Sequence, residues 1–169
     1  MLHGREAEFD VFARAHMPSL LRFALLLTGN SADAEDLLQS SLARTLTSWS
    51  KVCRADRPDQ YVRRVMVNAH ATGFRRAFRR RELTMAQLPD RAVHDDSSRI
   101  EDRSTLLDAL SSLTKAQRAV VVLRYVEDHS EAVTASILGV SVGTVKSQTH
   151  KALARLREHP AFETDRSSS

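Results

Sequence analysis

Helical periodicity is the feature that most limits what this chain can fold into. From Asp33 to Trp49 the apolar residues recur three or four positions apart and so share one face of a helix. These residues are Ala34, Leu37, Leu38, Leu42, Leu46 and Trp49. No stretch sustains the period-two alternation of a half-buried strand, and only 5 of the 169 residues are glycine. We therefore predict an all-α protein.

Other segments repeat this helical pattern. The N-terminal stripe is interrupted at Pro18, which predicts two helices or one kinked helix. The turn GNSAD precedes the second stripe, and we expect Ser31 or Asp33 to cap the helix that follows. A third helix is predicted over residues 59–80, with the inward residues Val62, Val65, Met66 and Ala69.

A change in composition divides the chain into two helical domains. Between residues 84 and 103 the sequence is polar and acidic, contains Pro89 and lacks a long apolar stripe. Helical pattern resumes at Leu106, and Thr114 with Gln117 forms a capping-box pair ahead of the run AVVVLRY. We expect a first domain over residues 1–83, a linker over 84–103, a second domain over 104–159 and a tail over 160–169.

The bulk composition favours an anionic partner and argues against several classes of protein. The net charge is +4 and the pI about 9.7. The lone Cys53 excludes an internal disulfide, and the N-terminus lacks the apolar core of a secretory signal. The longest apolar run, LLRFALLL, is too short to span a bilayer. We expect a soluble cytoplasmic protein, and the sequence shows no metal-ligand cluster, no glycine loop for a phosphate cofactor and no nucleophile–base pair.

The segment from Ala135 to Arg157 has the pattern of a helix-turn-helix unit. Such a unit needs a small residue where its helices cross, a glycine at the corner and a branched apolar residue in the second helix. Ala135, Gly139 and Val145 occupy these places, and Ser130 with Glu131, and Ser141, are expected to start the two helices.

The second helix of this unit is a candidate for reading DNA. It is expected to bury Val145, Thr149, Ala152, Leu153 and Leu156. Its free face carries small and basic residues, which suit a helix that enters a major groove. They are Gly143, Thr144, Ser147, His150, Lys151 and Ala154, flanked by Lys146 and Gln148. The alternative is a helical hairpin with a solvated charged face.

A second basic surface is predicted between Gln60 and Arg81, where the sequence has no carboxylate. The arginines of this segment are Arg63, Arg64, Arg75, Arg76, Arg79, Arg80 and Arg81. One helical face carries Arg64, Asn68, Thr72, Arg75 and Arg79 and could follow phosphates, while Tyr61 and Phe74 could contact unpaired bases. The alternative is a solvated Arg-rich helix.

Three stretches in this order resemble a known family. They are LLTGNSADAEDLLQSSLARTLTSW, DQYVRRVMVNAHATGFRRAFRRR and LSSLTKAQRAVVVLRYVEDHSEAVTASILGVSVGTVKSQTHKALARLR. The chain resembles the extracytoplasmic-function group of the sigma-70 family, the sigma factors of bacterial RNA polymerase, and within it an actinobacterial SigE-like subgroup. The resemblance covers nearly everything except the linker and the tail.

The resemblance implies a role for each stretch in transcription initiation. The helix from Asp33 to Trp49 would dock on the clamp of the polymerase β′ subunit through Asp36, Leu37, Gln39 and Ser40. The Arg-rich segment would capture the −10 element and hold the strands open through Tyr61, Arg64, Asn68, Thr72, Phe74, Arg75, Arg76 and Arg79. The C-terminal unit would bind the β flap and read the −35 element through Thr144, Lys146, Ser147, Gln148, His150 and Lys151.

The same resemblance implies core RNA polymerase and promoter DNA as partners, with catalysis left to the polymerase. The acidic linker would pass through the RNA-exit region, and an anti-sigma factor is a candidate partner. Subgroup relatives tend to carry an aromatic pair where this chain has Gly73 and Phe74, and many members have Arg at the position of Gln148. His129 and Thr134 depart from the pattern as well.

Two alternatives remain open from the sequence. One is a conventional helix-turn-helix repressor or activator, which would not need the DAEDLLQ helix. The other is an interaction protein that keeps the sigma fold but does not melt DNA, which the loss of one aromatic ring at Gly73 makes conceivable.

Overall fold

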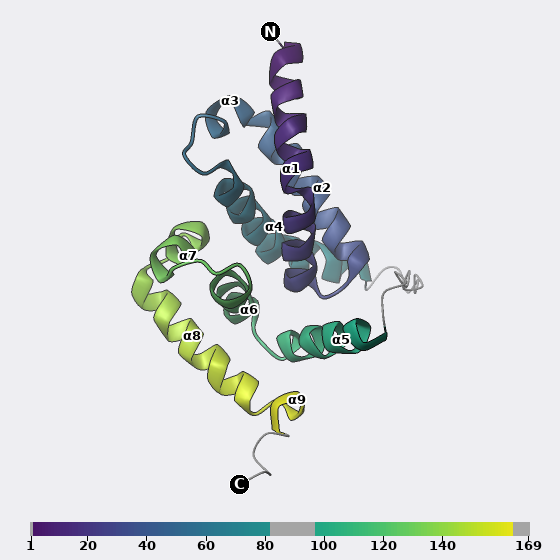
Figure 1. The fold of residues 1–169 in the computed structure, drawn as a ribbon, viewed down its shortest axis with the longest axis vertical. Helices are drawn as coiled ribbons and strands as arrows, with labels where there is room; N and C mark the ends of the chain where they lie inside the picture. Colours follow the sequence, from purple (N-terminus) through teal and green to yellow (C-terminus); the bar gives the residue numbers. More distant parts are fainter. Residues whose placement is uncertain (1, 82–96, 164–169) are drawn as a thin grey trace. The chain divides into compact units, whose positions relative to one another are not determined.

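The chain folds into helices grouped in two compact units. The structure is a computed structural model that describes residues 2–81 and 97–163, with side chains over 4–73 and 100–163. The described elements are all helices, which confirms the predicted all-α class (Figure 1). The contacts divide the chain into Met1–Leu88 and Pro89–Ser169, a boundary that lies inside the predicted linker. Among the described residues, no helix is long and apolar enough to cross a membrane.

The first unit is built on three long helices. They are α1 (Leu2–Thr28), α2 (Ser31–Thr47) and α4 (Pro58–Arg81), with the short α3 (Trp49–Val52) between the last two. α2 packs against both α1 and α4 (Figure 1). Their inward stripes form the core, whose most deeply buried members are Leu20, Phe23, Ala24, Leu27, Ala34, Leu38, Val62 and Met66. Leu46, which was predicted to be inward, is 40% exposed.

Pro18 does not divide the first helix. α1 continues through it as one element, so the predicted break into two helices is wrong. Proline removes the donor that would bond the carbonyl of Arg14, four residues earlier. Both residues are exposed, so water can solvate that carbonyl and the helix tolerates the loss.

The N-cap of α2 is Asn30, so the prediction of Ser31 or Asp33 is wrong. Gly29 adopts a left-handed φ of 87° after α1, and Asn30 then takes an extended conformation. The Asn30 Oδ1 accepts from the Asp33 backbone N–H at 2.9 Å, and its Nδ2 donates to the Asp33 carboxylate at 2.7 Å. The two-residue turn therefore places the cap one position earlier than expected.

One arginine of the first unit belongs to the core. Arg63 is only 6% exposed, lies over the Phe23 ring at 5.8 Å and pairs with Asp59 at 3.4 Å. Burial opposes ionisation of Asp59, but a hydrogen bond from Arg57 and the charges of Arg57 and Arg63 hold its pKa below the ordinary value. Asp59 is therefore ionised at neutral pH and balances the buried guanidinium.

The second unit begins with two helices joined by a capped corner. They are α5 (Ser97–Ser111) and α6 (Lys115–Val121), and α6 runs on into a single π-helical turn, η1 (Val122–Val126). The predicted capping box is confirmed, with hydrogen bonds of 3.2 and 3.1 Å between Thr114 and Gln117. Arg118 donates to the carbonyl of Leu110 at 2.9 Å and ties the end of α5 to α6.

Three further helices complete this unit. They are α7 (Glu131–Leu138), α8 (Val142–Arg157) and α9 (Pro160–Glu163). The last was predicted as tail, but Pro160 fits the first turn of a helix and His159 Nδ1 accepts from the Ala161 N–H at 3.2 Å.

The predicted linker also differs from the structure at its C-terminal end. Residues 84–96 lie outside the described residues, whereas residues 97–103 form the first turns of α5. Ile100 and Leu106 on this helix are exposed. The first half of α5 therefore shows no buried stripe that the sequence could have revealed.

Replacing Thr134 by valine is expected to stabilise the second unit. Thr134 is fully buried in α7 and its hydroxyl has no hydrogen-bond partner, so an apolar group of the same shape removes a desolvation cost. We expect a gain of about 1 kcal/mol in the free energy of unfolding. The control is Thr149→Val, because the Thr149 hydroxyl bonds the Val145 carbonyl at 2.8 Å. Thermal unfolding followed by circular dichroism would contradict the assignment if both variants shifted alike.

Candidate polymerase and DNA interfaces

The helix-turn-helix corner is formed by two capping serines and one glycine, all of which the sequence predicts. Ser130 caps α7 by accepting from the Val133 N–H at 3.2 Å, and Ser141 caps α8 by accepting from the Thr144 N–H at 3.1 Å. Between the two helices Gly139 adopts a left-handed conformation with φ 66° and ψ 35°. The predicted helix starts and the glycine corner are confirmed.

Packing behind the corner holds α8 in place. Ala135 and Val145 are buried against Val120 of α6, and Leu138 packs on the same cluster. The prediction that Ala135 and Val145 lock the two helices together is confirmed. On α8, Val145 and Ala152 are fully buried, while the other predicted inward residues, Thr149, Leu153 and Leu156, are half-buried.

The opposite face of α8 presents the residues expected there. Thr144, Lys146, Ser147, His150 and Lys151 are exposed, and Gln148 is half-buried. The Thr144 hydroxyl lies 2.9 Å from that of Ser141, so it takes part in the cap as well as facing outward.

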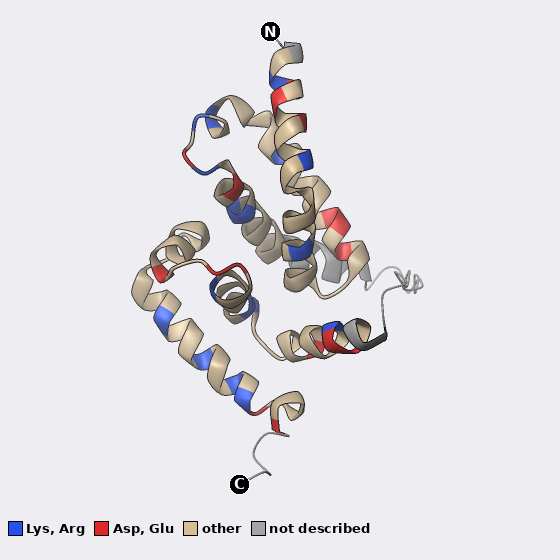
Figure 2. Cartoon of the chain, viewed as in Figure 1, with Lys and Arg blue, Asp and Glu red and all other residues tan. Residues whose placement is uncertain are grey.

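The charge of α8 lies along its two edges. The helix has no carboxylate, and Figure 2 shows lysine and arginine along its length. At about 100° per residue, Lys146 and Arg157 fall on one edge and Lys151 and Arg155 on the other, with Gly143, Ser147 and Ala154 between them. A helix with small side chains along the centre of its exposed face and cations along both edges fits a groove lined by phosphates. Arg155 and Arg157 were not among the predicted site residues, although extending the same helical wheel past Ala154 would have found them.

The predicted basic stripe of α4 is exposed where its side chains are described. Arg64, Asn68 and Thr72 are exposed on one face, and Tyr61 is 37% exposed. The Thr72 hydroxyl donates to the Asn68 carbonyl at 2.9 Å. α4 continues to Arg81, but the remaining predicted side chains, Phe74, Arg75, Arg76 and Arg79, lie outside the described ones.

The candidate docking face of α2 combines three exposed residues with one core residue. Asp36, Gln39 and Ser40 are exposed and fall within about 100° of one another around the helix. Leu37 is only 8% exposed and belongs mainly to the core. The Ser40 hydroxyl donates to the Leu37 carbonyl at 3.1 Å. The structure therefore brings the polar members together on the surface and turns Leu37 inward.

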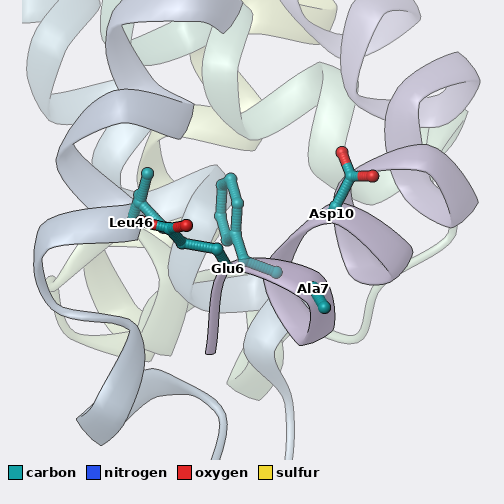
Figure 3. A pocket seen from close by; sticks show the side chains of 5 residues that line it. Glu6, Ala7, Asp10 and Leu46 are labelled. Atoms are coloured by element: carbon teal, nitrogen blue, oxygen red, sulfur yellow. The ribbon is translucent and has the colours of Figure 1, made fainter. Parts of the chain in front are cut away.

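A pocket beside α1 and α2 is lined by Glu6, Ala7, Phe9, Asp10 and Leu46 (Figure 3). Its lining includes two carboxylates but no hydroxyl, thiol, imidazole, lysine or arginine side chain. Among the described residues, no group of three or more His, Cys, Asp and Glu could hold a metal.

Comparison with known proteins finds a family match for each of the two units. Residues 12–81 match sigma-70 region 2, and residues 103–156 match sigma-70 region 4. The chain is 45% identical over 158 residues to the RNA polymerase sigma-E factor of Streptomyces avermitilis, which covers 94% of this chain and 88% of that one. The chain belongs to the sigma-70 family, in its extracytoplasmic-function group. The resemblance drawn from the sequence is confirmed.

Other relatives extend this result. This sigma factor is 32% identical to the ECF sigma factor SigL of Mycobacterium tuberculosis, over 84% of this chain and 82% of that one. Two solved structures show the same fold. Sigma factor RpoE of Bartonella quintana, in complex with the anti-sigma factor NepR, gives a TM-score of 0.76 at 24% identity and covers 94% and 99% of the two chains. CnrH, in complex with the cytosolic domain of CnrY, gives 0.64 at 20%, over 92% and 88%.

Sigma factors of this family direct core RNA polymerase to promoters and help to open them, so the predicted function is confirmed at the level of the family. The family is not classically enzymatic. A conventional helix-turn-helix repressor would have no counterpart of region 2, and that alternative is set aside.

Proposed function

We propose that this sigma factor divides its work among three surfaces, one on each of α2, α4 and α8. The observation that carries the proposal is that each of these helices buries one face and presents a different polar chemistry on the other. The α2 surface would hold the polymerase, the α4 surface the opened −10 element and the α8 surface the −35 element.

The docking surface consists of Asp36, Gln39 and Ser40, with the edge of Leu37 beneath them. A carboxylate, an amide and a hydroxyl on one exposed arc offer hydrogen-bond acceptors and donors to the β′ clamp. Burial of Leu37 keeps this arc in register with the core, because the residue cannot move outward without leaving a cavity.

The strand-holding surface runs along α4 from Tyr61 through Arg64, Asn68 and Thr72. Arg64 can contact a phosphate, and Asn68 can bond the edge of an unpaired base. Arg63 is held by Asp59 and Phe23, so it supports the helix from inside and does not add to the outer charge. We extend the surface to Phe74, Arg75, Arg76 and Arg79 from the sequence.

The −35 surface is the free face of α8. Lys151, Arg155 and Arg157 would contact phosphates, and Ser147 and His150 would face base edges from the middle of the helix. The same unit would bind the β flap, and the acidic segment between the two matched regions would pass through the RNA-exit region.

This assignment leaves catalysis to the polymerase, and the sigma factor is not an enzyme itself. It acts in the cytoplasm, where it meets core polymerase and promoter DNA, and needs no cofactor. Its structural relative RpoE was solved with an anti-sigma factor, which supports an anti-sigma factor as a further partner here.

Changing Asp36 and Gln39 together to lysine should weaken core binding by about tenfold or more, because the clamp would meet two cations in place of acceptors. Titration of labelled sigma factor with core polymerase measures the Kd. The matched control is Glu8→Lys with Ala15→Lys, which makes the same charge change at exposed positions of α1. Equal core affinity in the docking variant and the control would remove α2 from the interface.

Replacing Asn68 by alanine should impair promoter opening more than closed-complex formation. The side chain is exposed and would contact a base only after the strands separate, so its loss should cost about 0.5–1.5 kcal/mol, the usual net contribution of one hydrogen bond. Permanganate reactivity of thymines near the start site reports opening. A promoter melted in advance should restore the variant, and an equal defect on both templates would indicate a folding or docking role. Normal opening by the variant would remove Asn68 from the strand-holding surface, whereas a lack of opening by the wild type would favour an interaction protein that does not melt DNA.

Replacing His150 by alanine should relax base preference at one position of the −35 element. The loss should amount to about 1–3 kcal/mol on the preferred site, because a base contact and not a phosphate contact disappears. Selection from randomised −35 sequences compares the two proteins. Lys151→Ala is the control: it should weaken all sequences alike and reduce the salt slope by about 0.9. Identical preferences for the wild type and the His150 variant would exclude His150 from the reading face.

A further inference from the structure

One cation of the −35 surface already has an acidic partner. The Lys146 Nζ lies 3.8 Å from Glu131 Oε2, with the two side chains 65% and 37% exposed. The other cations of α8, which are Lys151, Arg155 and Arg157, make no ion pair with another described residue. Among the cations of this helix, Lys146 is therefore the one whose charge is balanced by another described residue before DNA arrives.

The fold holds the Glu131 carboxylate beside α8. Glu131 is the first residue of α7, directly after the Ser130 cap, where the helix dipole favours a negative charge. α7 and α8 are joined through Gly139 and packed together through Ala135 and Val145. The pair thus connects the two helices of the unit across a corner that cannot open without losing its core.

We propose that Glu131 competes with DNA phosphate for Lys146 and so lowers the affinity of this unit for DNA of any sequence. The proposal rests on the proposed function, in which α8 enters DNA with Lys146 at one edge. A phosphate that approaches Lys146 meets a carboxylate of its own sign well within the screening length of about 8 Å. The phosphate must displace that carboxylate or leave Lys146 unused.

The cost falls on the sequence-independent part of binding. Every DNA presents the same phosphates, so competition by Glu131 weakens preferred and unrelated sequences by the same factor. Contacts from the middle of α8 to base edges are not subject to this competition. Because Glu131 reduces only the phosphate part of the binding free energy, base contacts contribute a larger fraction of that free energy than they would without Glu131.

The test compares Glu131→Gln with Glu158→Gln in sigma factor reconstituted with core polymerase. Both variants lose one negative charge, but Glu158 is exposed at the C-cap of α8 and makes no ion pair with another described residue. The DNAs are a promoter with the −35 sequence obtained by selection and the same promoter with that element scrambled. Thermal unfolding of each variant checks that the fold is kept.

Glu131→Gln should bind both promoters about two- to fivefold tighter than wild type, the range expected for loss of one exposed ion-pair partner. The salt slope should become steeper by about 0.9, because one more phosphate is neutralised. Glu158→Gln should change affinity less. Equal effects of the two variants overturn the proposal, and so does tightening on the selected sequence alone, because Glu131 would then read a base.

Double variants show whether Lys146 carries the effect. In a Lys146→Ala background the gain from Glu131→Gln should fall to that of Glu158→Gln, while in a Lys151→Ala background it should persist in full. A gain of equal size in both backgrounds means that Glu131 repels DNA without Lys146 and overturns the proposal. The two lysine variants alone test the proposed function separately. If neither weakens DNA binding, α8 does not lie on DNA and both proposals fail.

Discussion

Burial of a single apolar face on each long helix is the constraint on which the rest of this structure depends. Val145 is fully buried while His150 of the same helix is exposed, and Met66 is fully buried while Asn68 is exposed. A helix fixed by one face must present the other in a defined direction, because rotating it would take apolar side chains into water. The core thus fixes the direction in which each candidate surface faces.

The charged residues of α2, α4 and α8 are distributed according to which face of each helix is exposed. α4 has no carboxylate after Asp59, and that residue is ionised beside the buried Arg63. The acid therefore satisfies the inward cation and does not reduce the outward charge of Arg64. On α8 the cations occupy the edges and small side chains the middle, so the side chains proposed to contact phosphates are separated from those proposed to contact bases. The candidate docking face of α2 is acidic and polar, so the surface proposed to bind polymerase differs in chemistry from the surfaces proposed to bind DNA.

The sequence predicts this fold best where the deciding interaction is local. The interactions of Ser130, Gly139 and Ser141 all reach residues no more than four positions away. The helix-turn-helix could therefore be predicted from the sequence alone. The cap of α2 was misplaced by one residue because the turn depends on the backbone of Gly29. The inward turn of Arg63 was missed because it requires Phe23 from another helix, which helical spacing within one segment does not reveal.

Two of the departures from the family pattern, Gln148 and Gly73, also differ in what surrounds them. Gln148 is half-buried, so a longer arginine there would have to extend past neighbours on α8 before it reached a phosphate. Gly73 is exposed, and a Cβ added there would meet no described atom within 4 Å apart from its chain neighbours and the backbone of its own helix. No close approach requires a glycine at this position, yet glycine costs a helix interior about 1 kcal/mol relative to alanine. Gly73 therefore acts through the backbone. It lowers the helical preference of α4 between Asn68 and the arginines that follow, in the segment proposed to hold the separated strand.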